Sequence, residues 1–375
     1  MTGRNAHSAA GVKVLIASIT AVGSPTATGQ LMDRLLASIN CAEALSLHFG
    51  HAAFDGERTQ VLFKRSKIRA IWRQIKAFEP DVMYVRPTLR PGIFNAFVGC
   101  LVVFAAKRLV IHIMDDEVMD KARGGLFKRG AFSLYLRWLI RRADYVFTIS
   151  PRMSAEYSAR YGRASVPIAN APELQLSATG AAMIRSKEPR IGYFGSLDER
   201  MNRNTVRQVA MAVARLRAKG LVASLDIYTR DLYLSWGAKH LDFDGVRLHG
   251  LVPLAEYVLT LKRYDLLLIA YNFDAQSIDY CRYSIANKLA DYIEAGRGIL
   301  TIGPPEIESV GLCIEHEIGH SLSGKEALIE RDLEAFLTRV VTDGIDSRAN
   351  AAAYSNAMQV ADSRVVWNEA FGVAS

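Results

Sequence analysis

Apolar runs of strand length alternate with amphipathic segments along the first half of the chain. The runs are short and almost continuously apolar, which is typical of parallel strands that are buried on both faces of a sheet. The segments 68–78 and 132–142 between them have the periodicity of helices. The predicted strands are 12–19, 45–49, 81–85, 108–114, 144–150 and 165–169.

The same alternation restarts after residue 188. We expect strands at 190–194, 223–229, 246–249, 265–271, 299–302 and 312–315, and helices at 204–219, 326–341 and 348–371. The pattern predicts an α/β protein of two tandem doubly wound, Rossmann-like domains that face each other across a cleft. The boundaries that follow are a disordered tail at 1–11, a first domain at 12–172, a linker at 173–188, a second domain at 189–355 and a last helix at 356–375.

Composition is that of a globular protein. The 375 residues are half apolar and 22% charged, and they are too many for one ordinary core. No apolar run reaches the length of about 18 residues that a membrane span needs, and the first dozen residues lack the apolar stretch of a signal peptide. The four cysteines are scattered and fit small buried side chains. We therefore expect cytoplasmic residence.

Charge is unevenly distributed. Residues 1–172 carry 24 Lys+Arg against 12 Asp+Glu, whereas residues 173–375 carry 22 against 26. A basic first half suggests an anionic partner, such as a lipid-linked phosphate or a membrane surface.

Three loops of the second half follow predicted strands and should meet at one rim of the sheet. The first contains glycine and two arginines, and we expect the helix start behind it to offer free N–H groups to an anion. The second is a strand end with glycine. The third leads into a helix. The candidate donor-binding residues on these loops are Gly195, Ser196, Arg200, Arg203, His249, Gly250, Tyr283 and Ser284.

The helix after the third loop carries a cation and a carboxylate three residues apart, at Lys288 and Asp291. This spacing places both side chains on one face, and the helix ends at Ala295–Gly296, where glycine suits a left-handed cap. Together the two side chains can hold a diphosphate and a ribose. Binding of a nucleotide-activated donor requires both of these contacts.

These motifs resemble the donor-binding domain of GT-B glycosyltransferases, and the chain is similar to glycosyltransferase family 4. The resemblance rests on Gly195-Ser-Leu, His249-Gly250-Leu-Val and the segment Ser284 to Gly296, in this order and spacing. The segment Ala143 to Ser150, with Tyr161-Gly162 and Asn170-Ala-Pro172, is similar to the end of that family's first domain.

The resemblance implies roles for individual residues. It assigns Lys288 to the donor diphosphate, Asp291 to the ribose hydroxyls and Gly195 to the vicinity of the phosphates. In the first domain it implies that a loop ending at Gly29 closes over the donor. It also implies that Asp115 and Asp116, after a strand, stand where the family often touches the transferred sugar, so we take Asp115, Asp116 and Lys288 as catalytic candidates.

The chain departs from the family pattern at several positions. Many members carry two glutamates eight residues apart, and here Tyr283 and Asp291 occupy the two places. Gly298 stands where proline is usual, and Asp115 or Asp116 stands where several members have histidine. The family's usual contact to the sugar hydroxyls is therefore not carried over, and the donor base and sugar stay open.

The resemblance also implies an activity. We expect transfer of a sugar from a nucleotide-sugar to a glycan or lipid-linked acceptor, with retention of configuration and without a metal or other cofactor, in cell-surface polysaccharide or lipopolysaccharide assembly. Arg200, Arg203 and Lys288 can neutralise the charge that grows on the departing phosphates. By the same resemblance, the last helix crosses back to the first domain.

Two other functions fit parts of the sequence. A nucleotide-sugar epimerase or hydrolase can use the same scaffold, because fold alone does not decide function. A zinc peptidase is suggested by His316-Glu317-Ile318-Gly319-His320, which matches the H-E-x-x-H pattern but contains an internal glycine and lacks a suitable third ligand.

The segment 63–76 is basic and amphipathic, with an apolar stripe at Ile68, Ile71, Trp72 and Ile75. Such a stripe usually packs on a sheet, but the flanking lysines and arginines also suit a helix on an anionic membrane, at the inner face of the plasma membrane. No nucleic-acid-reading module is present in the sequence, so we do not expect a nucleic-acid partner.

Overall fold

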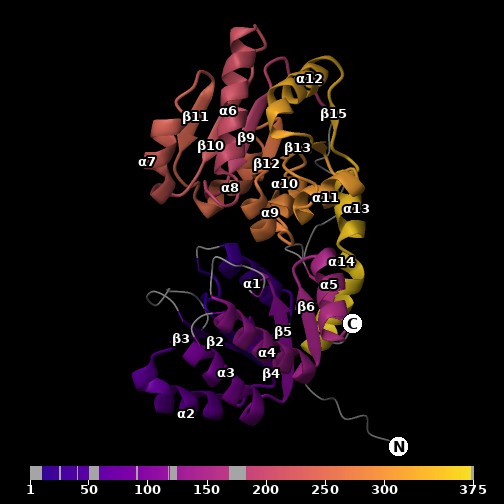
Figure 1. The fold of residues 1–375 in the computed structure, drawn as a ribbon. Helices are drawn as coiled ribbons and strands as arrows, with labels where there is room; N and C mark the ends of the chain where they lie inside the picture. Colours follow the sequence, from indigo (N-terminus) through magenta and orange to yellow (C-terminus); the bar gives the residue numbers. More distant parts are fainter. Residues whose placement is uncertain are drawn as a thin grey trace, which may run out of the picture. The chain divides into compact units, whose positions relative to one another are not determined.

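The computed structural model describes residues 11–24, 27–39, 41–49, 59–89, 92–116, 118, 125–168 and 183–372. These residues form two compact units (Figure 1). The first unit contains the described residues up to 168 together with those from 358 onward, and the second contains residues 183–357. The tail at 1–10 and most of the predicted linker lie outside the described residues.

The first unit is built on a seven-stranded sheet with the order β3-β2-β1-β4-β5-β6-β7, in which every neighbouring pair is parallel. The order reverses between β1 and β4, which is the topological switch point of a doubly wound sheet. The strands are β1 (Val12–Ser18), β2 (Cys41–His48), β3 (Thr59–Leu62), β4 (Val82–Val85), β5 (Arg108–Ile113), β6 (Tyr145–Thr148) and β7 (Val166–Pro167).

The helices of the first unit connect successive parallel strands, except for the last one. They are α1 (Ala27–Ala37), the 3-10 turn η1 (Arg65–Lys67), α2 (Ile68–Phe78), α3 (Gly92–Phe104), α4 (Leu126–Arg142), α5 (Pro151–Tyr161) and α14 (Val360–Ala370). Helix α14 packs on this unit through Trp367, which is 1% exposed and lies edge-on to Phe147 at 5.1 Å between ring centroids. The Trp367 indole also donates a hydrogen bond to the Leu35 carbonyl of α1.

The second unit has a six-stranded parallel sheet with the order β11-β10-β9-β12-β13-β14, so its switch point lies between β9 and β12. The strands are β9 (Arg190–Phe194), β10 (Ser224–Tyr228), β11 (Val246–His249), β12 (Leu266–Ala270), β13 (Gly298–Ile302) and β14 (His320–Leu322). Two short strands, β8 (Met183–Ile184) and β15 (Ile345–Asp346), pair antiparallel beside it.

Helices cover this second sheet. They are α6 (Arg203–Ala218), α7 (Asp231–His240), α8 (Leu254–Leu261), α9 (Ala275–Cys281), α10 (Lys288–Glu294), α11 (Glu308–Glu315), η2 (Glu326–Leu328), α12 (Ile329–Thr342) and α13 (Asn350–Ala357). Buried side chains of α6 and α12, such as Val209 and Leu333, form one core with Ile191, Leu225 and Leu268 from the strands. The predicted α/β class with two parallel sheets is therefore confirmed.

Several elements differ from the sequence prediction. The predicted strand 312–315 is the end of helix α11, because a short apolar run does not distinguish a buried helix from a strand. The strands β3, β8, β14 and β15 were not predicted. The single helix expected at 348–371 is two helices, α13 and α14, separated at Gln359, whose φ of 50° is left-handed.

No helix in the described part of the chain has both the length and the apolar character that crossing a membrane requires.

Candidate functional site

The switch point of the second sheet is where ligands of doubly wound proteins bind, outside the carboxyl ends of the strands. Two loops meet there, one after β9 and one after β12. The first carries Gly195, Ser196, Arg200 and Arg203, and the second leads through Tyr283 and Ser284 to Lys288. The topology thus brings most of the predicted donor residues of this unit to one place.

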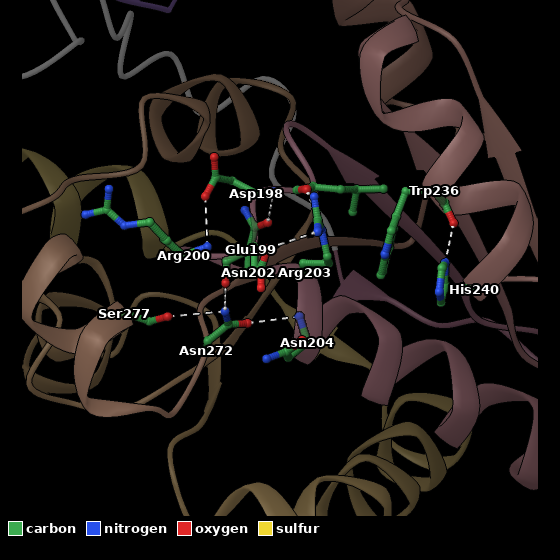
Figure 2. Close-up of polar contacts among 11 residues, drawn as sticks. Asp198, Glu199, Arg200, Asn202, Arg203, Asn204, Trp236, His240, Asn272 and Ser277 are labelled. Carbon is green, nitrogen blue, oxygen red and sulfur yellow. Dashed lines mark hydrogen bonds and ion pairs between the residues drawn. The ribbon is translucent and has the colours of Figure 1, made fainter. Parts of the chain in front are cut away.

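Asn272 ties these two loops together (Figure 2). It is 1% exposed, and its Oδ1 accepts hydrogen bonds from the backbone N–H groups of Asn204 and Thr205 at 3.1 and 3.2 Å. Its Nδ2 donates to the Glu199 carbonyl at 2.8 Å and to Ser277 Oγ at 3.2 Å. One buried side chain therefore fixes the loop after β9 against the loop after β12.

The same network closes the start of α6. The N–H of Arg203 donates to the Asp198 carbonyl, Asn272 takes the next two N–H groups, and the N–H of Val206 bonds the Asn202 carbonyl. The expectation that this helix start offers free N–H groups to an anion is wrong, because each of its first donors already has an acceptor. An anion at this rim needs another source of positive charge.

Lys288 is the candidate that the sequence offers for that source. It begins α10, and its Nζ lies 4.3 Å from the centroid of the Tyr193 ring. Burial lowers the pKa of Lys288 to about 7 from its ordinary 10.5, since a desolvated ammonium is costly. No hydrogen bond or ion pair to Lys288 exists among the residues that the structure describes. Among the described residues, the lysine therefore has an aromatic neighbour but no ion-pair partner at the switch point.

Gly195 makes room for this lysine. A Cβ placed on Gly195 would lie 2.6 Å from Lys288 Nζ, much closer than a real contact allows. The backbone at Gly195 is held by its N–H, which donates to the Tyr228 carbonyl at 2.9 Å. The absence of a side chain here, predicted to matter for phosphate approach, also determines where the ammonium can sit.

Ser196 is the next residue along this loop. Its carbonyl accepts a hydrogen bond of 2.6 Å from the Tyr193 hydroxyl, which anchors the loop to the buried strand β9. Within the described residues, its own N–H and hydroxyl have no hydrogen-bond partner. Two donors therefore remain for a ligand beside Gly195.

The two predicted arginines are held differently (Figure 2). Arg203 is used by the fold, because its Nε donates to the Leu197 carbonyl at 3.0 Å and its guanidinium lies over Trp236 at 4.7 Å. Arg200 sits in the loop, with its guanidinium 4.1 Å from the centroid of Tyr280. Arg203 therefore has a structural role in addition to any contact with a ligand.

His249 and Gly250 lie at the end of β11, two strands away from β9. The His249 ring stacks on Tyr228 at 4.5 Å, and Tyr228 stacks on Phe194 at 4.6 Å. His249 Nε2 also lies 3.1 Å from Oδ1 of the buried Asp226. Gly250 faces open space apart from Asp231. A stack of three rings therefore connects His249 with the strand that carries the switch-point loop.

The third loop is shaped by Ser309 in the first turn of α11. Ser309 Oγ donates to the Ser284 carbonyl and accepts from the Ala286 N–H, each at 2.8 Å, and it lies 2.9 Å from the Tyr271 hydroxyl. Tyr283 and Ser284 are both partly buried in this loop. These hydrogen bonds therefore fix the position of the loop that precedes Lys288 in the chain.

Asp291 lies in α10 three residues after Lys288 and is partly buried, as the predicted helix requires. The helix ends at Gly296, whose φ of 67° is left-handed, as predicted. Tyr292 connects α10 to the sheet, because its hydroxyl accepts a hydrogen bond of 3.2 Å from the Phe194 N–H. Lys288 and Asp291 are thus carried on a short helix that is fixed to β9.

Asp115 and Asp116 belong to the first unit, where they follow β5. Asp115 is 43% exposed at its side chain and pairs with Arg86 at 2.6 Å. Asp116 is 9% exposed, accepts a hydrogen bond of 2.8 Å from the Tyr157 hydroxyl and lies 3.6 Å from Arg160. Asp115 is therefore the more accessible of the two carboxylates, and Asp116 serves the packing of α5.

Gly29 also belongs to the first unit, in the first turn of α1. A Cβ on Gly29 would lie 2.2 Å from Ser24 Oγ and 2.9 Å from the Ala21 carbonyl. The Gly29 carbonyl accepts a hydrogen bond from the N–H of Gly23. Close packing of the loop after β1 thus explains this glycine, and Pro25 and Thr26 of that loop lie outside the described residues.

The H-E-x-x-H match does not form the helix that a zinc peptidase needs. His316 is the cap that follows the last residue of α11, Glu317 and Gly319 have φ values of 54° and 70°, and His320 begins β14. The His320 ring stacks on Phe336 at 4.2 Å and lies 3.2 Å from Arg339. The two histidines therefore lie on different elements.

Sequence reasoning missed Asn272, Ser309 and Tyr193. Asn272 directly follows the predicted strand 265–271. A polar side chain at the end of a strand at the switch point could have identified this residue. Ser309 was missed because 312–315 was assigned to a strand, which hid the first turn of α11. Tyr193 lies inside an apolar run, where nothing distinguishes a tyrosine that contacts a lysine from a core residue.

No protein-family model matches the chain, and no curated protein does. Solved structures match over nearly its whole length. WaaG, a glycosyltransferase involved in lipopolysaccharide biosynthesis, superposes with a TM-score of 0.58 at 11% identity, over 96% of this chain and 100% of that one. An α,α-trehalose-phosphate synthase (UDP-forming) from Burkholderia vietnamiensis gives 0.58 at 10% identity, over 97% and 98%. The lipopolysaccharide outer core galactosyltransferase WaaB gives 0.56 at 14% identity, over 96% and 98%.

The chain therefore has the GT-B fold of these glycosyltransferases, which confirms the fold that the sequence resemblance predicts. At these identities the likeness concerns the fold alone.

Proposed function

We propose that the protein is a glycosyltransferase that uses a nucleotide-sugar, and that its second unit holds the donor diphosphate with Lys288. The observation that carries this proposal is the ammonium of Lys288, which lies at the switch point against Gly195 with no ion pair among the described residues. Perturbed ionisable groups of this kind mark functional sites more often than chance.

Electrostatics explain why a diphosphate fits. Burial lowers the pKa of Lys288 to about 7, so the free protein carries this charge at a cost. A diphosphate beside the ammonium would raise that pKa again, because an opposite charge favours the protonated form. The N–H and hydroxyl of Ser196 would supply neutral donors to the same phosphates, and Asp291, one turn further along α10, would accept from the ribose hydroxyls.

The chemistry that this arrangement supports is departure of the diphosphate. In the proposed reaction, the bond between the anomeric carbon and the phosphate oxygen breaks while the acceptor oxygen bonds the same carbon. The acceptor proton passes to the departing phosphate oxygen, so no carboxylate nucleophile is consumed and configuration is retained. A fixed cation stabilises the charge that develops on the leaving group, and we propose that Lys288, with Arg200, does so without a metal.

The first unit would bind the acceptor. Its Asp115 is an exposed carboxylate after β5 and is oriented by Arg86, so we propose it as the contact to the transferred sugar. The excess of lysine and arginine in residues 1–172 favours an anionic acceptor. Assembly of cell-surface polysaccharide or lipopolysaccharide fits this charge, and two of the structural neighbours are named for lipopolysaccharide synthesis.

Isothermal titration with a panel of nucleoside diphosphates and nucleotide-sugars tests the donor site. We expect one nucleoside diphosphate to bind in the micromolar range and Lys288→Ala to remove that binding. Lys262→Ala, an exposed lysine of the same unit, is the matched control. If Lys288→Ala binds as the unchanged protein does, the site is wrong. Conversion of the bound nucleotide-sugar without any acceptor would instead identify the epimerase or hydrolase alternative.

A further inference from the structure

The outer faces of α2, α3 and α4 contain no acidic residue. Residues 59–78, 92–114 and 125–143 include no Asp or Glu at all, although they span three helices of an otherwise mixed-charge unit. The lysines and arginines of these segments are Lys64, Arg65, Lys67, Arg69, Arg73, Lys76, Lys107, Arg108, Lys128, Arg129, Arg137, Arg141 and Arg142. Such one-signed helices create a strong local positive potential.

The three helices lie side by side on one face of the first sheet, with α3 in the middle (Figure 1). Trp72 of α2 contacts Phe97 and Phe104 of α3 at 6.2 Å between ring centroids. On the other side, Gly99 of α3 faces Tyr135 and Trp138 of α4. A Cβ placed on Gly99 would lie 3.8 Å from each of these rings. The surface of α3 is therefore flanked by a basic helix on either side.

The apolar stripe of α2 is not the exposed part of this surface. Ile71 and Ile75 are buried against the unit, which is the packing that such a stripe usually indicates. The exposed residues of η1 and α2 are cations, including Arg65, Arg69 and Arg73, together with small or uncharged polar residues. This helix thus contributes charge, and the apolar contribution comes from its neighbours.

Large apolar side chains protrude from α3 and α4. Among the described residues, the four most exposed large apolar side chains all lie here: Phe127 at 89%, Leu126 at 83%, Phe104 at 75% and Leu134 at 71%. The solvent face of α3 consists of small or apolar residues until Lys107, namely Ile93, Ala96, Cys100, Val103 and Phe104. Exposed large apolar side chains that gather on one surface usually mark an interaction site.

We propose that α3 and the start of α4 dock this protein onto an anionic lipid bilayer. Phe104, Phe127 and Leu134 would enter the boundary between headgroups and acyl chains, and the cations of α2 and α4 would lie against the anionic headgroups. Each element alone is weak, but apolar insertion and basic charge together provide the two signals that stable membrane attachment requires. The proposal is independent of the donor site, which lies in the other unit.

Vesicle flotation provides the test. The unchanged full chain should float with vesicles of phosphatidylcholine and 30 mol% phosphatidylglycerol at about 0.1 M salt, and much less with pure phosphatidylcholine or at about 0.5 M salt, where screening is strong. The charge variant Arg65→Gln, Arg69→Gln, Arg73→Gln, Lys76→Gln and the apolar variant Phe104→Ser, Phe127→Ser, Leu134→Ser should each lose about tenfold or more in partition coefficient.

Matched controls come from the second unit. Leu232→Ser with Leu259→Ser removes apolar side chains of 62% and 64% exposure, and Lys239→Gln, Lys262→Gln, Arg263→Gln, Lys325→Gln removes four exposed cations. These variants should float as the unchanged protein does. If they lose binding as strongly as the test variants, binding depends on net charge or on non-specific hydrophobic adsorption, and the proposed surface is wrong.

Cys100 gives a direct readout of the site. It is exposed on the middle of the α3 face, whereas Cys281 and Cys313 are buried. In a Cys41→Ser background, a polarity-sensitive fluorophore on Cys100 should shift to the blue when anionic vesicles are added. An unshifted probe on a floating protein would overturn the assignment of the surface. The membrane proposal would be overturned if the unchanged protein did not float with vesicles at all. It would also be overturned if the chain self-associated and the apolar variant abolished this self-association and not vesicle binding.

Discussion

Gly195 and Lys288 share one small space in the second unit: a single Cβ on the glycine would lie 2.6 Å from the lysine ammonium. The two residues are 93 positions apart in sequence, and only the switch point of the sheet brings them together. The glycine thus determines where a cation can stand, and the cation determines where an anion can bind.

Gly195→Ala should therefore weaken nucleoside diphosphate binding while leaving the fold intact. The atom in the way is the far end of a flexible lysine, so the side chain can move aside, but it then leaves the phosphate site. Loss of one charge-assisted contact corresponds to about a tenfold to hundredfold increase in Kd. Titration calorimetry measures this change.

Gly324→Ala is the control for this substitution. Gly324 has only Asp332 near its built Cβ, at 3.6 Å, and its variant should bind as the unchanged protein does. Unaltered affinity in Gly195→Ala would show that the ammonium is not used for the ligand.

Lys288→Met should separate stability from binding. The partly buried ammonium of Lys288 is desolvated at a cost in the free protein, so an isosteric apolar side chain should raise the melting temperature by about 2–4 °C, which corresponds to about 1 kcal/mol for a unit of this size. The same variant should lose nucleoside diphosphate binding. A lower melting temperature together with intact binding would contradict both expectations.

The pH dependence of stability should carry the same signature. The pKa of Lys288 is about 7 in the folded protein and ordinarily 10.5, so between these values the unfolded chain holds more protons than the folded one. The contribution of this residue to the free energy of unfolding therefore increases as pH rises from 7 to 10.5. Denaturant titrations across this window give the free energy of unfolding at each pH. Plotted against pH, this free energy should rise less steeply for Lys288→Met than for the unchanged protein.

Much of this architecture could be predicted from the pattern of the chain. The runs at 190–194 and 246–249 are strands with the predicted bounds, because buried parallel strands leave continuous apolar segments. Lys288 and Asp291 could be placed on one helix from their spacing and from the glycine that ends it. What could not be predicted was contact across the sheet, since the pairing of Gly195 with Lys288 and of Asn272 with α6 depends on strand order.

Charged residues were the least predictable part of the site. In the sequence, both Arg203 and Lys288 are candidates for a diphosphate, but the Arg203 side chain contacts Leu197, Glu199 and Trp236 in the fold. The start of α6 looked open for the same reason, and it is closed by a side chain from a loop 68 residues away. Local patterns reveal which groups are present, and tertiary contacts determine which of them stay available.

Asn272→Ala should be among the most destabilising substitutions in the second unit. It removes the acceptor of two N–H groups of α6 and a donor to the Glu199 carbonyl, in a position that is 1% exposed. Buried groups left without partners cost about 1–3 kcal/mol each, so a loss of about 3 kcal/mol in the free energy of unfolding is expected. Hydrogen exchange should show faster opening at residues 198–205. Asn204→Ala, which removes a side chain but keeps the bonded N–H, is the control, and equal losses in both variants would contradict the capping role.

Trp367→Ala should destabilise the first unit, although the residue lies near the chain's end. The indole of Trp367 is 1% exposed, contacts Phe147 at 5.1 Å and Phe371 at 4.6 Å, and donates to the Leu35 carbonyl at 3.2 Å. Removing a buried tryptophan leaves a cavity and costs about 3–5 kcal/mol. Hydrogen exchange of peptides from β4, β6 and α1 should accelerate, while peptides from α6 and β12 should not.

Trp236→Ala, a partly buried aromatic in the second unit, should show the opposite distribution with a smaller effect. Protection lost equally in both units by Trp367→Ala would mean that α14 does not serve the first unit as a local part of its core.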